Sequence, residues 1–178
     1  MHYAYWLLLA LLSITSAHAG DIAMKEIRFR GGLVSFSIPK HWVEESERDT
    51  TGLFYADVPD SGALRLDVIT YKLPKPLSKD AAFEELKANS RLKSHSIQRL
   101  KNGNAIATAI ERASDQGTAT TLFWWHVTNP VHPDHVRLAN FSYTVPTSRE
   151  GTDTVKREVQ MLTESIKNAK FHPTIGQY

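Results

Sequence analysis

The chain has 178 residues and carries 21 basic against 19 acidic side chains, which gives a net charge of +2 at pH 7. Because this charge is small and the basic residues are scattered, the composition argues against a nucleic-acid ligand or an anionic membrane surface. The lack of cysteine excludes disulfide bonds, thiol catalysis, thiolate metal sites and lipid attachment at a cysteine.

The N-terminal segment is more apolar than the rest of the chain. Residues 4–12 (AYWLLLALL) carry no charge, and an apolar core of about ten residues is about half of what a membrane span needs. The Ala-His-Ala sequence at 17–19 has the small-x-small pattern that signal peptidase cleaves. No Lys or Arg precedes the apolar core, and a buried N-terminal helix is the alternative. We expect a signal peptide over 1–19 and a single mature domain over 20–178.

The absence of cysteine also bears on where the mature protein works. Exported proteins without disulfides are common in the bacterial envelope, whereas small secreted domains elsewhere depend on them. We therefore expect a periplasmic protein with no membrane anchor.

Four strands are predicted in the first part of the mature chain. Residues 33–38 alternate apolar and polar side chains, which is the period of a strand with one buried face. Further strands are expected from Trp42, over 51–58 and over 63–73, and a short apolar start at 27–29 precedes the first of them.

A helix is predicted next, because Pro74 and Pro76 interrupt the strand pattern. Ser78 can cap its N-terminus, and the apolar stripe that follows carries the helix to about Leu92. Asn102-Gly103 is a strong hairpin signal because both residues tolerate positive φ. Strands are expected on both sides of this turn and beyond it, over 96–100, 105–112, 118–128 and 136–145.

The last helix is predicted from Val155, because Val155, Val159, Leu162 and Ile166 recur at the spacing of one helix face. A capping box over 147–150 can precede it. The order is thus four strands, a helix, four strands and a helix, and the hairpin-length connections favour antiparallel pairing. The predicted fold class is α+β, with an antiparallel β-sheet flanked by two helices.

One motif is similar to that of a known family. Residues 36–42 (FSIPKHW) resemble the F-x-x-P-x-x-W opening of the PsbP-like and DcrB-like proteins. The order of strands and helices is similar over most of the mature chain, although few residues match. The resemblance implies a PsbP-like fold and a mainly non-enzymatic role, since these families include photosystem accessory subunits, periplasmic envelope proteins and chaperones of secretion effectors. It carries over no catalytic residue.

The 118–128 strand offers candidate partner-binding residues. A period of two puts Leu122, Trp124 and His126 on one face, opposite the other aromatic residues of this strand. Tyr55 belongs to a comparable second face on an earlier strand. Either a helix covers this second face, or the face forms an uncovered apolar groove that receives a partner segment or a small ligand.

The loop after this strand raises the question of a metal. His132 and His135, with Asp134 or His126 nearby, could supply nitrogen and oxygen donors to a divalent ion. The alternative is a proline-rigidified loop with solvated histidines. We favour the loop, since metal sites recruit further ligands and no other cluster is visible. No metal or cofactor is therefore expected.

The motifs of hydrolases, zinc proteases, phosphate-binding loops and dinucleotide folds are all absent from the sequence, so no catalytic residue is assigned. We expect a non-enzymatic periplasmic binding or accessory protein that contacts another protein. Its narrower form is an immunity or chaperone partner of a secreted bacterial toxin. The alternatives are a hydrolase built around His126 and a carboxylate such as Asp67, or a small-molecule carrier that uses the second sheet face. The sequence predicts no oligomeric state.

Overall fold

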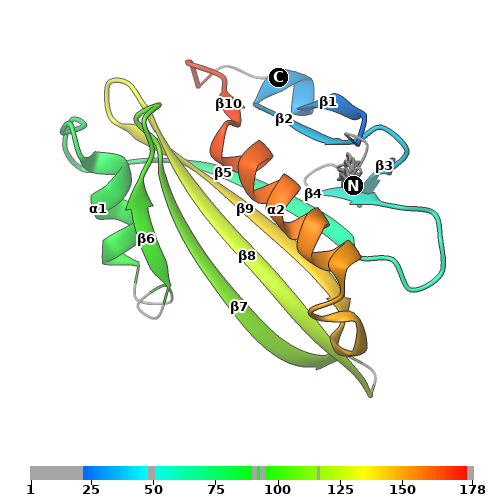
Figure 1. Cartoon of the computed structure of the whole chain (residues 1–178). Coiled ribbons are helices and arrows are strands. Elements are labelled where there is room, and N and C mark those ends of the chain that lie inside the picture. The colour runs from blue at the N-terminus through cyan, green and yellow to red at the C-terminus, as the bar shows by residue number, and fades with distance from the viewer. Residues whose placement is uncertain (1–21, 48–50, 90–91, 93–94, 116, 176–178) are drawn as a thin grey trace, which may run out of the picture.

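The computed structural model describes residues 22–175, apart from 48–50, 90–91, 93–94 and 116. The predicted signal peptide over 1–19 therefore lies outside the described residues. Figure 1 shows a large twisted sheet, with one long helix across one of its faces and a smaller sheet beside that helix.

The described elements follow in the order β1 (Met24–Phe29), η1 (Arg30–Gly32), β2 (Val34–Pro39), β3 (Val43–Glu47), β4 (Thr51–Tyr55), β5 (Ala63–Lys72), α1 (Ala81–Ala88), β6 (Ser96–Arg99), β7 (Ala105–Asp115), β8 (Thr118–Val131), β9 (His135–Pro146), η4 (Thr147–Arg149), α2 (Asp153–Lys167) and β10 (Lys170–Phe171). The strands form a seven-stranded sheet in the order β3-β4-β5-β9-β8-β7-β6 and a three-stranded sheet in the order β1-β2-β10. Both are antiparallel, which confirms the α+β class. The sequence predicted one sheet, whereas the structure has two. The second sheet forms because β1 and β10 pair with β2 instead of joining the large sheet.

The core lies between the large sheet, α2 and the small sheet. We call the face of the large sheet that turns to α2 the inner face, and the opposite face the outer face. Phe54 and Phe141 of the inner face are 0% exposed, and the ring of Phe36 from the small sheet meets them edge-on at centroid distances of 5.3 and 5.2 Å. Trp42 stacks on Tyr143 at 5.8 Å. These contacts join both sheets in one hydrophobic cluster.

Helix α2 closes this core through the predicted face. Val155, Leu162 and Ile166 are buried, and Val159 is partly buried against the same cluster. The predicted capping box is wrong, because residues 147–149 form a 3-10 turn. The chain reaches the helix only after Gly151, whose φ of +85° breaks the turn. Thr152 is the cap instead, since its side chain accepts a hydrogen bond from the Val155 amide.

Helix α1 is shorter than predicted. Its N-terminal residue is Ala81 and the capping position belongs to Asp80, so the proposed cap at Ser78 is wrong. The Ala81 amide instead donates to the Ser78 carbonyl in a turn before the helix. The helix ends before Asn89, whose backbone is extended. Within the described residues, neither α-helix has the length and apolar character that crossing a membrane requires.

Candidate binding surfaces

The outer face carries the four predicted partner-binding residues. Leu122, Trp124 and His126 alternate along β8, and Trp125 lies on the inner face as predicted, where its Nε1 donates to Thr163 of α2 at 3.1 Å. Cross-strand pairing places Tyr55 of β4 in the same row as Leu122. Strands β5 and β9 lie between them, which separates the two residues by roughly 14 Å. The structure therefore brings three candidates together and sets Tyr55 apart on the same face.

Trp124 is held in place by its neighbours. Its ring stacks on His126 with centroids 5.4 Å apart and an interplanar angle of 9°. Its Nε1 donates to the Glu111 carboxylate at 3.0 Å. His126 in turn has its Nδ1 2.7 Å from Oδ1 of Asn140, and its ring lies 5.3 Å from that of His95. Each of these contacts restricts a side-chain rotation, so the cluster is ordered before any partner arrives.

The environment of His126 favours its neutral form. Burial lowers the pKa of the imidazole, and the nearby His95 lowers it further, while the Asn140 hydrogen bond and Glu111 oppose the shift. A neutral ring with Nδ1 donating to Asn140 leaves Nε2 as a hydrogen-bond acceptor.

The outer face is only partly covered by a helix. Helix α1 packs Ala82 and Leu86 on Ala105 and Ala107 of β7, and the Thr128 hydroxyl donates to the Ala82 carbonyl at 2.6 Å. These residues lie at one end of the face. The structure thus matches neither alternative in full, because α1 covers that end only, while Ile69 on β5 is 53% exposed and Trp124 is partly exposed.

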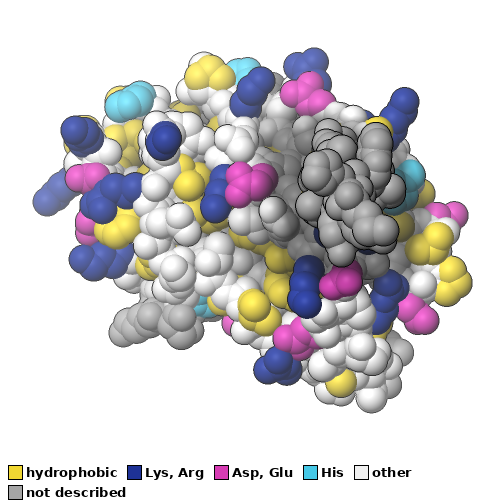
Figure 2. Space-filling view, in the orientation of Figure 1, with side chains coloured by type: hydrophobic (Ala, Val, Ile, Leu, Met, Phe, Trp, Pro, Cys, Tyr) yellow, Lys and Arg dark blue, Asp and Glu magenta, His cyan; other side chains and the backbone are white. Residues whose placement is uncertain are grey.

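A second surface lies on the inner face, beside α2. Two adjoining hollows of about 360 and 340 Å³ share Phe123 and Val159, and we call them together the α2–β7 groove. Trp125 lines the groove, and Ile110 at its rim is 61% exposed. Figure 2 shows hydrophobic side chains at the surface beside α2, interspersed with charged ones. An apolar groove is therefore present on the inner face, opposite the second face for which the sequence left a groove open as one alternative.

Simple geometry could have revealed this groove. A helix is about 10 Å wide, whereas seven strands span about 29 Å. One helix and a three-stranded sheet leave part of such a face open. The sequence did contain a signal for this open area. The strand predicted over 105–112 adds to the width of the sheet, and the last helix is too narrow to cover this strand as well as the others.

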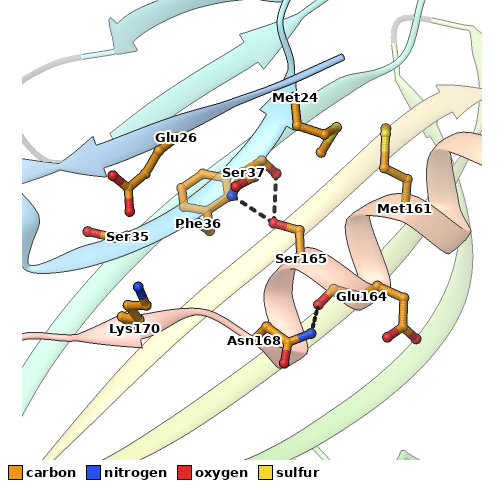
Figure 3. Close-up of a pocket in the computed structure, with 10 residues that line it drawn as sticks. All are labelled: Met24, Glu26, Ser35, Phe36, Ser37, Met161, Glu164, Ser165, Asn168 and Lys170. Atoms are coloured by element: carbon orange, nitrogen blue, oxygen red, sulfur yellow. Dashed lines mark hydrogen bonds between the residues drawn. The ribbon is translucent and has the colours of Figure 1, made fainter. Parts of the chain in front are cut away.

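A third hollow, of about 430 Å³, lies between β2 and the C-terminal half of α2. Figure 3 shows Met24, Phe36 and Met161 as its apolar residues. At its edge the Ser37 amide donates to Ser165 Oγ at 2.7 Å, and the same hydroxyl donates to the Ser37 carbonyl at 2.7 Å. Ser165 therefore ties α2 to the strand edge that β10 leaves open.

The histidine loop does not bring the candidate metal ligands together. His135 Nδ1 lies 2.7 Å from Asp134, and His132 is exposed. His126 precedes His132 by six residues of nearly continuous strand, roughly 20 Å at the rise of a strand, and it cannot join them. Across the described ranges, no group of three or more potential ligand side chains is placed to hold a metal ion.

The pair suggested for hydrolysis is likewise separated. Asp67 and His126 share one cross-strand row, with Asn140 of β9 between them, so the two lie about 10 Å apart. Asp67 accepts a hydrogen bond from Thr51 at 2.6 Å. The carboxylate thus neither orients the imidazole nor receives its proton.

Comparisons with known proteins bear on the fold. No protein-family model and no curated protein matches the sequence. A crystal structure from Bacteroides thetaiotaomicron VPI-5482 matches with a TM-score of 0.58 and 23% identity, over 83% of this chain and 48% of that one. This chain thus spans about half of that protein.

Two further structures are similar. The crystal structure of LpqN, involved in cell envelope biogenesis of Mycobacterium tuberculosis, matches with a TM-score of 0.53 and 12% identity over 86% of each chain. The solution structure of PsbP (CyanoP) from Synechocystis sp. PCC 6803 matches with a TM-score of 0.37 and 14% identity, over 87% of this chain and 96% of that one.

These likenesses concern the fold alone, because the identities are low. The match to LpqN extends over most of both chains and agrees with the mixed α+β architecture. A PsbP protein, from the family that the sequence motif resembles, is also among the similar structures. The DcrB-like part of the resemblance stays a prediction.

Proposed function

We propose that the protein is a non-enzymatic accessory protein of the bacterial cell envelope that binds another protein through the outer face of its large sheet. The observation that carries this proposal is Trp124, fixed by its stacking on His126 and its hydrogen bond to Glu111 on a face that α1 covers only at one end. Tryptophan is enriched among the residues that dominate binding energy at protein interfaces. Leu122 extends the same surface along β8.

The order of the cluster matters for affinity. A partner that contacts a free side chain must immobilise it, at a cost of about 0.5–1.5 kcal/mol for each such side chain. Trp124, His126 and Asn140 are already fixed by one another. An open sheet surface with fixed aromatic anchors suits a protein partner better than a small molecule, which needs a concave site.

The cellular setting and the kind of partner are narrower proposals. Export to the periplasm follows from the predicted signal peptide, and the envelope role of LpqN, a structural neighbour, supports an envelope setting by analogy. An immunity or chaperone role towards a secreted toxin follows from the family resemblance only. Co-purification of a secreted effector would separate this role from a general accessory function.

A second candidate is a small-molecule carrier, and one observation favours it. The hollow between β2 and α2 measures about 430 Å³, which is within the usual size of a ligand site. Met24, Phe36 and Met161 offer it apolar contacts. A carrier would use this hollow and leave Trp124 free of contact.

Site-specific crosslinking tests the proposal. Trp124 is replaced by a photoreactive phenylalanine analogue in cells, and envelope extracts are analysed by mass spectrometry after irradiation. We expect one protein to be crosslinked from position 124 and none from exposed Lys40 at the small sheet. Co-purification of that protein should be lost with Trp124→Ala and kept with Lys40→Ala. Equal crosslinking from both positions, or none, would refute a partner on the outer face, and labelling of Met161 by a small ligand would favour the carrier.

A further inference from the structure

Strand β7 is much longer than β6, the edge strand that pairs with it. β6 pairs with residues 105–108, whereas β7 continues to Asp115 and pairs with β8 along its whole length. Figure 1 shows β7 running well past the lower end of β6. Within the described residues, nothing pairs with the other side of residues 109–114, so this part of the sheet ends in an open edge.

The hairpin fixes which backbone groups face that edge. The Leu100 amide donates to the Asn104 carbonyl at 2.8 Å, so Asn104 directs its backbone groups towards β6. Successive residues of a strand direct these groups alternately to the two sides. Ile110, Arg112 and Ser114 therefore present their N–H and C=O groups to the open edge, while the residues between them bond to β8.

The open edge adjoins the α2–β7 groove. Ile110 points to the inner face, beside Phe123 of β8, and both line the groove together with Val159 of α2. A strand added to this edge would direct every second side chain over the inner face, where the groove offers an apolar surface. Backbone pairing and alternating apolar contacts would thus act together.

A second copy of this chain does not suit the edge. Two copies can pair there antiparallel about a two-fold axis, which sets side chains of the same face opposite each other. Registers centred on Glu111, Arg112 and Ala113 place Glu111, Ala113 and Asp115 of the second copy across from Glu111, so none of them offers this carboxylate a basic residue. Like charges opposite each other destabilise a strand pair. In a register centred on Ile110, the second copy would overlap β6. In a register centred beyond Ala113, it would extend past the end of β7.

The charges at the edge favour a basic residue in the partner. The Arg112 guanidinium is neutralised by Glu150, at 3.1 and 2.8 Å. Glu111 is exposed on the outer face, where it accepts only the uncharged Trp124 Nε1 within the described residues. A cation directly across from Glu111 would therefore form a favourable cross-strand pair.

We propose that an extended segment of the partner protein adds to residues 109–114 of β7 as a further strand. Its alternate apolar side chains enter the α2–β7 groove, and a Lys or Arg lies across from Glu111 on the outer face. This inference rests on the proposed function, because it describes how the protein that contacts Trp124 is held. Glu111 joins the two surfaces, since it lies on the strand that carries the open edge and its carboxylate also accepts a hydrogen bond from Trp124.

A tethered peptide tests strand addition. Because the chain has no cysteine, Ala119→Cys gives a single attachment point for a flexible linker followed by Thr-Val-Lys-Val-Thr-Val. Amide exchange is then followed by NMR in the full mature protein. We expect about tenfold slower exchange at Ile110, Arg112 and Ser114. The amides of Glu111 and Ala113 should not change, because they already bond to β8.

Matched controls separate strand addition from other contacts. Changing the peptide lysine to glutamate should weaken the protection, and Ser114→Pro, which removes an edge N–H, should abolish it at that end. Ser114→Ala keeps the N–H and should behave as the wild type, and Ile110→Ser should reduce protection through the loss of apolar contact. Uniform protection, no protection, or equal protection by the glutamate peptide would overturn the inference.

The result also separates the two proposals. A Trp124-dependent partner together with no alternating protection would leave the proposed function intact and refute strand addition. Alternating protection by the peptide without any partner crosslinked at position 124 would support strand addition and refute the outer-face function.

Discussion

The two faces of the large sheet differ in burial, and strand β5 shows this difference between its alternating side chains. Leu64 and Leu66 point to the inner face and are 0% exposed. Arg65, Asp67 and Ile69 point to the outer face and are exposed. Burial of the inner set of side chains therefore stabilises the fold through the hydrophobic effect, whereas the outer set contributes little to the core. Substitutions on the two faces should differ in what they damage.

The largest expected loss of stability comes from Leu162 of α2. Its side chain is 0% exposed, and Leu162→Ala removes apolar contacts and leaves a cavity, at a cost of about 2–5 kcal/mol. Urea unfolding measures this change. Gln160→Ala on the exposed side of the same helix should shift the free energy of unfolding by less than about 0.5 kcal/mol. Equal effects of the two substitutions would mean that α2 is peripheral to the core.

Gly62 tests how closely the inner face is packed. A Cβ at this position would lie 2.1 Å from the Tyr143 hydroxyl oxygen, and Tyr143 is fully buried with its hydroxyl bonded to Glu158 at 2.5 Å. Gly62→Ala should therefore destabilise the fold by about 3 kcal/mol. Gly103→Ala meets nothing within 4 Å, and only its positive φ opposes the change, at about 1 kcal/mol. Similar melting temperatures for both variants would contradict this packing.

The link between α2 and the small sheet should contribute less. Ser165→Ala leaves the Ser37 amide and carbonyl without the hydroxyl that pairs with them. Because Ser37 is only partly buried, water can replace part of this bonding, and we expect a loss of about 1 kcal/mol. Amide exchange at Ser37 should become faster. Unchanged exchange at Ser37 would show that the hydroxyl does not hold the strand edge.

The outer-face cluster should make stability depend on pH. Burial lowers the pKa of His126 below its ordinary value of 6.5, so the unfolded chain binds more protons than the folded one between these two pKa values. The contribution of His126 to the free energy of unfolding is therefore fully present above pH 6.5. It is lost as the pH falls from 6.5 towards the lower pKa of the folded state. His126→Gln should flatten the dependence, and His132→Gln in the exposed loop should not. An unchanged pH profile in His126→Gln would place the titrating group elsewhere.

The sequence allowed the local structure of both faces to be predicted. The alternation of Leu122, Trp124 and His126 with the inward residues of β8 is a local property of a strand, and so is the apolar stripe of α2. The structure confirms both. The hairpin at Asn102-Gly103 is also confirmed, with a φ of +84° at Gly103.

Long-range features could not be predicted in the same way. The pairing of β10 with β2 links Lys170 to Ser35 across most of the chain, and two residues of strand carry no periodic signal. How far α1 covers the outer face depends on where Asn89 ends the helix. The α2–β7 groove depends on the relative widths of a helix and a seven-stranded sheet, which no local pattern records.

The central claim is that Trp124 serves binding and not the core. Two quantities measured on Trp124→Ala test it most directly: the free energy of unfolding in urea, and the affinity for the partner crosslinked at this position. The ring is partly exposed and its hydrogen bond lies at the surface, so we expect a loss of about 1 kcal/mol in stability. The affinity should fall at least about tenfold, as for an anchor residue of an interface. A loss of stability as large as that of Leu162→Ala, with unchanged affinity, would contradict the account.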